Sequence, residues 1–222
     1  ILIPTKLNTV AKNTLESHGG YNVIQNDIKD LNDLIVEHSD THALIVRSEK
    51  ITSEIIDLLP DLKIIVRAGA GYNTIDTKYA RKKGIDVMNT PGANANAVAE
   101  EVVALMLADA RHLIPGDISC RQGKWEKKKF MGTEITSKTV GIVGFGAIGQ
   151  LVAKRLSGFE VKILAFDPFL KVEKARLFDA VPVDLKQIFE ECDYISLHMP
   201  ENDETRGIIN KSLLGLMKDG AT

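Results

Sequence analysis

Three glycines spaced as Gly-x-Gly-x-x-Gly give the strongest chemical signal in the sequence. Gly144, Gly146 and Gly149 follow an apolar run and precede a segment with helical periodicity. In a dinucleotide-binding turn, the first glycine permits a tight bend, the second lets the backbone approach a pyrophosphate, and the third lets helix and strand pack closely. Free N–H groups and the helix dipole favour an anion there. The motif therefore predicts a dinucleotide site.

An acidic residue ends the strand expected after this motif. Asp167 lies 18 positions after Gly149, directly after the apolar run 161–166. In dinucleotide-binding folds, a carboxylate at this place accepts hydrogen bonds from the hydroxyls of the adenosine ribose. Because Asp167 would repel a 2′-phosphate, the sequence favours NAD over NADP as the cofactor. The alternative is a glycine-rich turn that binds no ligand.

His198 ends the next expected strand, at residues 194–197. The C-terminal ends of strands form the ligand edge of an open α/β sheet, so we expect His198 to line the cofactor site rather than to act as a general base. The other four histidines lack the spacing of metal ligands, and Cys120 and Cys192 lie in no motif. We therefore expect no metal site and no disulfide framework, as is typical of a reducing, cytoplasmic compartment.

The elements that must position these residues alternate along the whole chain. Apolar runs predict strands at 1–3, 21–24, 43–46, 62–66, 85–88, 139–143, 161–166, 181–183 and 194–197. Helical periodicity predicts helices at 9–17, 28–37, 52–59, 75–83, 97–113, 147–157, 185–191 and 211–217. Val- and Ile-rich strands that alternate with helices indicate parallel sheets covered on both faces. We expect a boundary between two such α/β regions in the loop at 89–96.

Composition and charge exclude several classes of protein. The chain has 222 residues, of which 44% are hydrophobic and 26% charged, with a net charge of −2. These fractions are far from those of a disordered chain. A slightly acidic balance gives no reason to bind nucleic acid or an acidic membrane surface. No apolar run approaches the roughly 18 residues of a membrane helix, so we expect no membrane association.

Several further motifs point to one family. They are Leu-Ile-Val-Arg-Ser at 44–48, Val-Arg-Ala-Gly-Ala-Gly at 66–71, Val-Met-Asn-Thr-Pro at 87–91, Gly-Lys-Trp-Glu-Lys-Lys-Lys-Phe-Met-Gly-Thr-Glu at 123–134, the glycine motif, and Asp167-Pro168. On these motifs, nearly the whole chain resembles the D-isomer-specific 2-hydroxyacid dehydrogenases. The resemblance implies two doubly wound parallel-sheet α/β lobes: a flavodoxin-like substrate lobe at 1–92 and an incomplete Rossmann NAD lobe at 93–222.

The resemblance also implies substrate-binding residues in the first lobe. Arg47 and Ser48 would face a small anionic hydroxyacid, since an Arg fork binds carboxylate or phosphate bidentately. The turn Gly69-Ala70-Gly71 would offer backbone N–H groups to the substrate carboxylate. Asn94 matches an Asn beside the substrate. The alternatives are a surface Arg, a plain tight turn and a helix-capping Asn. Ala70 departs from the hydroxyl residue that the family often has there, which removes one contact on the nicotinamide side.

In the second lobe, the resemblance adds residues to the cofactor site. Those around the pyrophosphate, the ribose and the adenine would be Ala147, Ile148, Pro168, Met199, Pro200 and Thr205. Ala147 stands where the family commonly has Arg, so one phosphate contact is absent. Met199 stands at a position where the family frequently has Thr or Leu.

A basic block lies between the two lobes' motifs. Arg121 to Lys129 contains five cations and one carboxylate. The resemblance implies a homodimer or homotetramer through the NAD lobe, with Trp125 and Phe130 as apolar anchors. We expect one of the lysines 127–129 to bind a substrate phosphate across the dimer. The alternative is a solvated loop.

The block at 123–134 is most typical of family members that oxidise 3-phospho-D-glycerate to 3-phosphohydroxypyruvate with NAD, the first step toward serine. The alternatives are a glyoxylate/hydroxypyruvate reductase, a D-lactate dehydrogenase, or a non-enzymatic, NAD-sensing corepressor of the same fold. Hydride transfer also needs an acid–base group and a cation. The family's Arg, Glu and His for these roles fall beyond Thr222, so we expect these 222 residues alone to be inactive.

Overall fold

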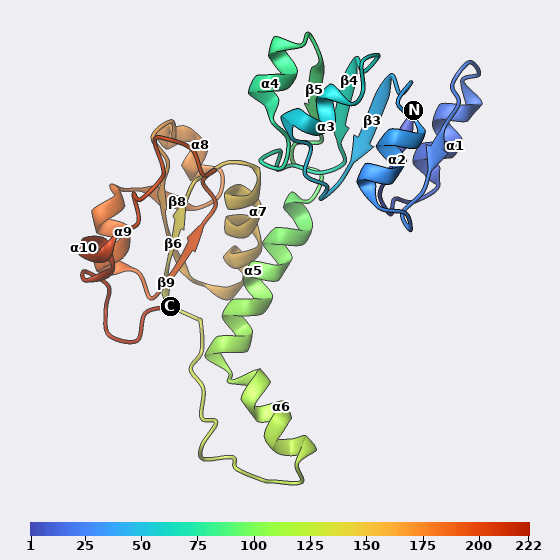
Figure 1. Ribbon diagram of the computed structural model, residues 1–222. Helices are drawn as coiled ribbons and strands as arrows, with labels where there is room; N and C mark the ends of the chain where they lie inside the picture. Colours follow the sequence, from blue (N-terminus) through green and yellow to red (C-terminus); the bar gives the residue numbers. More distant parts are fainter. The chain divides into compact units, whose positions relative to one another are not determined.

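The computed structural model describes all 222 residues, and the chain divides into two compact units (Figure 1). The first unit comprises residues 1–94 and the second residues 95–222. Each unit contains its own parallel β-sheet with helical connections. The two doubly wound α/β regions predicted from the sequence are therefore confirmed.

The first unit is built on a five-stranded parallel sheet in the order β2-β1-β3-β4-β5. Its strands are β1 (Leu2–Ile3), β2 (Ile24–Gln25), β3 (Ala43–Val46), β4 (Ile64–Arg67) and β5 (Asp86–Asn89), and its helices are α1 (Val10–Ser17), α2 (Leu31–Glu37), α3 (Ser53–Asp57) and α4 (Thr77–Lys82). Leu44 and Ile65 from the strands share one core with Leu34, Ile55 and Ala80 from three helices. Strand β2 lies on one side of β1, whereas β3, β4 and β5 follow on its other side. In open α/β sheets, ligands usually bind at the C-terminal ends of the two strands where the order reverses, here β1 and β3.

Side-chain caps explain why two helices of this unit begin later than periodicity predicts. Asp30 accepts a hydrogen bond from the N–H of Asn32, and Asp76 accepts one from the N–H of Tyr79. An N-cap carboxylate satisfies a donor that the first turn leaves unpaired. Gly84, at a φ of +74°, ends α4 in the left-handed conformation that favours glycine. The predicted helices 28–37 and 75–83 are therefore each trimmed to the capped segment.

The second unit has a four-stranded parallel sheet in the order β8-β7-β6-β9. Its strands are β6 (Thr139–Val143), β7 (Lys162–Phe166), β8 (Ala180–Pro182) and β9 (Tyr194–Leu197). Its helices are α5 (Ala95–Ala110), α6 (Leu113–Arg121), α7 (Ala147–Leu156), α8 (Val172–Arg176), α9 (Leu185–Glu191) and α10 (Lys211–Leu214), with a 3-10 turn η1 at Ser157–Phe159. No helix of the structure is both long and apolar enough to cross a membrane.

Helices cover both faces of this second sheet, which explains why its inner strand β6 is apolar on both faces (Figure 1). Val140 and Ile142 of β6 share a core with α5 and α7, whereas Val143, on the other face, packs with Ile188 and Phe189 of α9. Because successive side chains of a strand point to opposite faces, both sets of positions must be apolar.

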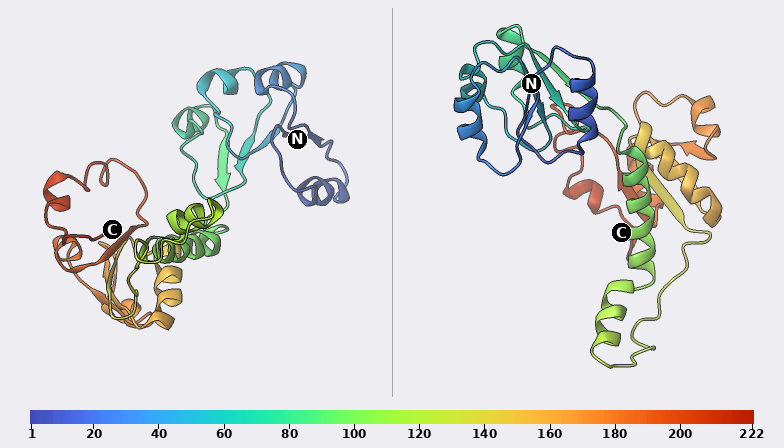
Figure 2. Two further views of the ribbon diagram at one scale, coloured as in Figure 1. Left: turned by 90° about the horizontal axis from the view of Figure 1, so that it is seen from below. Right: turned by 90° about the vertical axis from the view of Figure 1, so that its right-hand side faces the viewer.

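The predicted helix 97–113 is wrong in its last turn, because the chain breaks there into α5 and α6. His112 lies between them in the left-handed conformation, at a φ of 50°. Pro115, two residues after the predicted end of that helix, lies in the first turn of α6, where a missing N–H removes no intrahelical bond. Figures 1 and 2 show α6 extending away from the sheet, and residues 122–138 returning to β6. We call residues 113–138 the arm.

Candidate functional site

The glycine turn between β6 and α7 has the geometry that each glycine of the motif requires. Gly144 has a φ of +92°, and a Cβ there would lie 2.7 Å from the backbone of His198 and Met199. A Cβ on Gly149 would lie 2.3 Å from the carbonyl oxygen of Gly144. A Cβ on Gly146, by contrast, would meet nothing within 4 Å. The turn therefore packs tightly against β9 and α7 but is open above the first turn of α7, where N–H groups lack intrahelical acceptors.

Asp167 is fixed beside this turn by two backbone hydrogen bonds. Its Oδ2 accepts from the N–H of Phe145 at 2.9 Å, and its Oδ1 accepts from the N–H of Phe169 at 2.9 Å. The first bond joins the end of β7 to the glycine turn. Each carboxylate oxygen retains a second lone pair for another donor. Asp167 and the adjacent Pro168 therefore lie at the C-terminal edge of the sheet, as the ribose assignment requires.

The end of β9 contributes His198, Met199 and Pro200 to the same edge. The N–H of His198 donates to the carbonyl of Val143 at 2.7 Å, and its Nε2 lies 2.9 Å from the hydroxyl of Ser196. Burial lowers the pKa of His198, which favours the neutral imidazole near pH 7. Met199 and Pro200 line a pocket of about 280 Å³. The structure thus brings the predicted cofactor residues of three strands to one edge of the second sheet.

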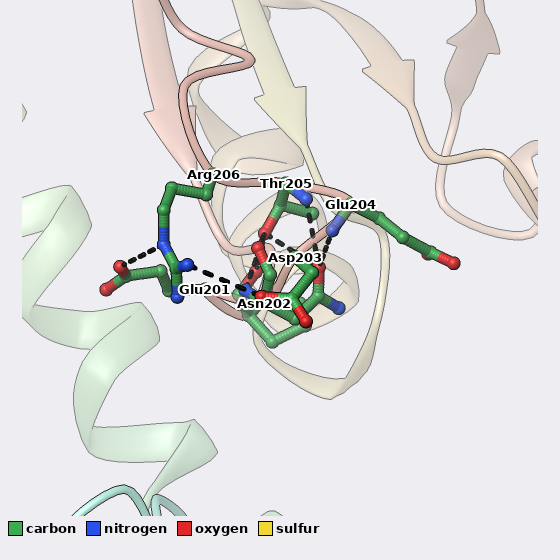
Figure 3. Close-up of polar contacts among 7 residues, drawn as sticks. Glu201, Asn202, Asp203, Glu204, Thr205 and Arg206 are labelled. Atoms are coloured by element: carbon green, nitrogen blue, oxygen red, sulfur yellow. Dashed lines mark hydrogen bonds and ion pairs between the residues drawn. The ribbon is translucent and has the colours of Figure 1, made fainter.

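The remaining predicted cofactor residue, Thr205, closes a loop beside this pocket (Figure 3). Its hydroxyl donates to the carbonyl of Pro200 at 2.5 Å and accepts from the N–H of Asn202 at 2.9 Å. Arg206 in turn lies between Glu201 and Asp203, at 3.5 and 3.4 Å (Figure 3). The single hydroxyl proton of Thr205 is engaged inside the loop. Its contribution is therefore to shape one wall of the pocket.

In the first unit, the predicted substrate residues Arg47 and Ser48 directly follow β3. Both are exposed, and their backbone N–H groups donate to one carboxylate oxygen of Glu49, at 2.7 and 3.1 Å. Partial burial on its own raises the pKa of Glu49, but these two hydrogen bonds and one from the Thr5 hydroxyl outweigh it and hold the pKa below its usual value. Sequence reasoning missed Glu49, because its partners are set by the loop conformation.

The glycine turn after β4 lies at the neighbouring strand end, since Val46 pairs with Arg67 in the sheet. A Cβ on Gly69 would lie 1.3 Å from the Nη1 of Arg67, so this guanidinium fills the space beside the turn. Its Nε is buried and has no hydrogen-bond partner. Asn89 donates from its Nδ2 to the carbonyl of Ala70 at 2.7 Å. Sequence reasoning missed Arg67, although an Arg at a strand end before a glycine turn was the signal.

The other candidate residues have simpler surroundings. Asn94 is exposed directly before α5. Both cysteines are free, and burial raises the pKa of the Cys192 thiol to about 12. No group of three or more His, Cys, Asp or Glu side chains in the structure is placed to hold a metal ion.

Known proteins match the chain over its whole length. Residues 1–153 match the catalytic domain of the D-isomer specific 2-hydroxyacid dehydrogenases, and residues 103–222 match the NAD binding domain of the same family. A hydroxypyruvate reductase of Thermotoga maritima is 48% identical over 82% of this chain and 58% of its own length. A D-3-phosphoglycerate dehydrogenase of Archaeoglobus fulgidus is 43% identical over 85% of this chain and 36% of its own length.

Solved structures agree with these matches. An NAD⁺-bound 3-phosphoglycerate dehydrogenase of Entamoeba histolytica is 34% identical, with a TM-score of 0.78 over 98% of this chain and 68% of that chain. An acyclic imino acid reductase (Bsp5) in complex with NADPH and D-Arg is 32% identical, with a TM-score of 0.82 over 98% of this chain and 71% of that chain. With its glycine turn, the carboxylate of Asp167 beside that turn and both domain matches, this NAD-binding chain belongs to the D-isomer specific 2-hydroxyacid dehydrogenases.

Proposed function

We propose that the whole protein oxidises 3-phospho-D-glycerate to 3-phosphohydroxypyruvate with NAD, the first step of serine biosynthesis, in the cytoplasm. The observation that carries the proposal is the joint placement of Asp167 and the glycine turn, tied together through the N–H of Phe145. The substrate assignment is supported by the similarity to D-3-phosphoglycerate dehydrogenases and by the sequence motif at 123–134. The chain spans 58% of the length of the Thermotoga reductase and 36% of that of the Archaeoglobus dehydrogenase, so the proposal concerns the whole protein.

The second unit would hold the dinucleotide by its backbone and by one carboxylate. The N–H groups of Gly146, Ala147 and Ile148 would bind the pyrophosphate, because the first turn of α7 leaves its donors unpaired. Asp167 would accept hydrogen bonds from the ribose hydroxyls. Bound NAD supplies the hydride acceptor. His198, as a neutral imidazole, would line the cofactor site without adding a charge to it.

The first unit would hold the anionic substrate at two adjacent strand ends. Arg47 and Ser48 follow β3, and the turn of residues 69–71 follows β4. To the predicted set we add Arg67, whose guanidinium lies against Gly69. Two guanidinium groups and a run of backbone N–H groups suit a substrate with a carboxylate and a phosphate. Asn94 would donate from its amide to the same substrate.

Hydride removal from a secondary alcohol also requires a base for the hydroxyl proton and a cation beside the developing carbonyl. We assign these roles to a His–Glu pair and an Arg beyond Thr222, following the family resemblance. Activity and cofactor binding must therefore both be measured on the whole protein.

The arm supports an assembly through the NAD lobe. Five large apolar side chains of the arm are exposed: Leu113, Ile114, Ile118, Trp125 and Met131. Trp125 is 86% exposed, and several large exposed apolar side chains on one segment suit a protein contact. We propose that this surface forms a homodimer, within which the lysines 127–129 reach the substrate phosphate of the partner subunit.

The hydroxypyruvate reductase of Thermotoga maritima supplies the second candidate function, because its identity to this chain is the higher of the two. The test compares kcat/KM of the whole protein for 3-phospho-D-glycerate oxidation with NAD and for hydroxypyruvate reduction with NADH. The proposal predicts at least a tenfold preference for the phosphorylated substrate pair. A preference for hydroxypyruvate over 3-phosphohydroxypyruvate would contradict it.

A further inference from the structure

A second carboxylate shares a pocket with Asp167. The pocket, of about 330 Å³, lies at the C-terminal ends of β7 and β8. Asp167 and Asp184 line it together with the apolar side chains of Phe166, Leu170 and Val183. No Lys, Arg or His is among its lining residues. The pocket therefore carries two negative charges and no cation to balance them.

Asp184 is held at this edge by the backbone around it. It is the N-cap of α9, where its Oδ1 accepts a hydrogen bond from the N–H of Gln187 at 2.8 Å. The preceding residue, Val183, donates its N–H to the carbonyl of Ala165 in β7 at 3.0 Å. These two bonds anchor both the side chain and the backbone on the strand that leads to Asp167. The carboxylate is thus a fixed feature of the pocket wall.

We propose that Asp184 is a second determinant of the cofactor choice, which acts with Asp167 to exclude the 2′-phosphate of NADP. The inference rests on the proposed placement of the adenosine ribose at Asp167. With the ribose there, a 2′-substituent is next to the pocket that both carboxylates line. A phosphate monoester carries about −1.5 to −2 charges at pH 7, so it would meet two like charges and no donor cation.

The choice must be made by side chains, because the fold itself accepts either nucleotide. The Bsp5 reductase holds NADPH and the Entamoeba enzyme holds NAD⁺ on closely similar backbones. In this chain the only charged residues that line the pocket beside the proposed ribose position are two aspartates, and its other lining residues are apolar. Electrostatic exclusion of the wrong ligand, rather than extra contacts to the right one, is a common way to gain specificity.

The test is calorimetric titration of the whole protein with NAD⁺ and with NADP⁺. We expect Asp184→Asn to tighten NADP⁺ binding about tenfold and to leave NAD⁺ binding within twofold, since Asn caps a helix as well as Asp does. Asp184→Ser is the second variant, because Ser is also an N-cap. The control is Asp179→Asn, which removes the same charge from an exposed position at the opposite end of β8.

Salt gives an independent readout of the same mechanism. The gap between the affinities for NAD⁺ and NADP⁺ should narrow as ionic strength rises in the wild type, and less so in Asp184→Asn. The inference about Asp184 would be overturned if Asp184→Asn binds NAD⁺ but its ratio of NAD⁺ to NADP⁺ affinity stays within twofold of the wild-type ratio. That result would leave the proposed cofactor site standing. A wild-type chain that binds neither nucleotide would overturn the proposed cofactor site as well.

Discussion

The two units place their candidate residues in the same kind of position but fix them by different means. In the second unit, the site is made by backbone: a Cβ on Gly144 or Gly149 would collide with main-chain atoms. In the first unit, the loops after β3 and β4 are shaped by charged side chains, with Glu49 beneath the N–H groups of Arg47 and Ser48 and with Arg67 beside Gly69. A backbone-built site tolerates almost no substitution at its glycines, whereas a side-chain-built site depends on charge.

The largest effect should come from the glycine that is packed most tightly and has a positive φ. Gly144→Ala adds a Cβ 2.7 Å from the backbone of His198 and Met199 and forces an L residue to a φ of +92°. We expect it to destabilise the second unit by about 3 kcal/mol, from strain and overpacking together. Urea unfolding measures this loss of stability.

Gly146→Ala is the matched control for that substitution, because its Cβ meets nothing within 4 Å. It should change the stability by less than about 1 kcal/mol and yet weaken NAD⁺ binding, since the new methyl group lies in the open space above α7. Equal stabilities of the two variants would show that the turn is not fixed by backbone packing.

Removal of the Glu49 side chain should have the next largest effect on stability. Glu49→Ala leaves the N–H groups of Arg47 and Ser48 without their acceptor, and we expect a loss of about 1–2 kcal/mol in the first unit. Lys50→Ala, at the exposed neighbouring position, is the control and should have little effect. If Glu49→Ala were as stable as this control, the claim that a charged side chain shapes the loop after β3 would be contradicted.

The arm should affect substrate binding without affecting the cofactor. Neutralising Lys127, Lys128 and Lys129 together in the whole protein should raise the KM for 3-phospho-D-glycerate about tenfold, equivalent to about 1.4 kcal/mol. The KM for NAD should stay within twofold, because the proposed cofactor site consists of the glycine turn and Asp167 and includes none of these lysines. Steady-state kinetics test both values, and an unchanged KM for 3-phospho-D-glycerate would contradict the role of the lysines.

The smallest effect should be a pH dependence carried by Glu49. Because its pKa is lowered in the folded state, its contribution to stability is present above the pKa of the unfolded chain and is lost as pH falls through the folded pKa. Glu49→Gln keeps an acceptor but no longer titrates. Its unfolding free energy should therefore decline less steeply below about pH 4.5 than that of the wild type. Parallel declines in urea unfolding across this range would contradict the assignment.

The contrast between a site built from backbone and one built from side chains explains which features could be predicted from the sequence. The glycine motif, Asp167 and both parallel sheets were predictable because spacing and periodicity encode local backbone requirements. Glu49 was not, since its partners belong to a loop conformation that sequence spacing does not report. Arg67 was overlooked, although its place at a strand end before a glycine turn was a signal; its approach to Gly69 is visible only in the structure. The break between α5 and α6 was missed for a related reason: His112 adopts a left-handed conformation without the glycine that would have marked it.

The central claim is that the second unit holds NAD on the glycine turn and Asp167. The most direct measurement is an NMR titration of the ¹⁵N-labelled whole protein with NAD⁺. We predict saturable shifts of the amide signals of Phe145, Gly146, Ala147 and Ile148, abolished by Asp167→Ala together with the loss of its bond to Phe145. Saturable shifts that leave these four amides unmoved, or no saturable shift at all, would contradict the account.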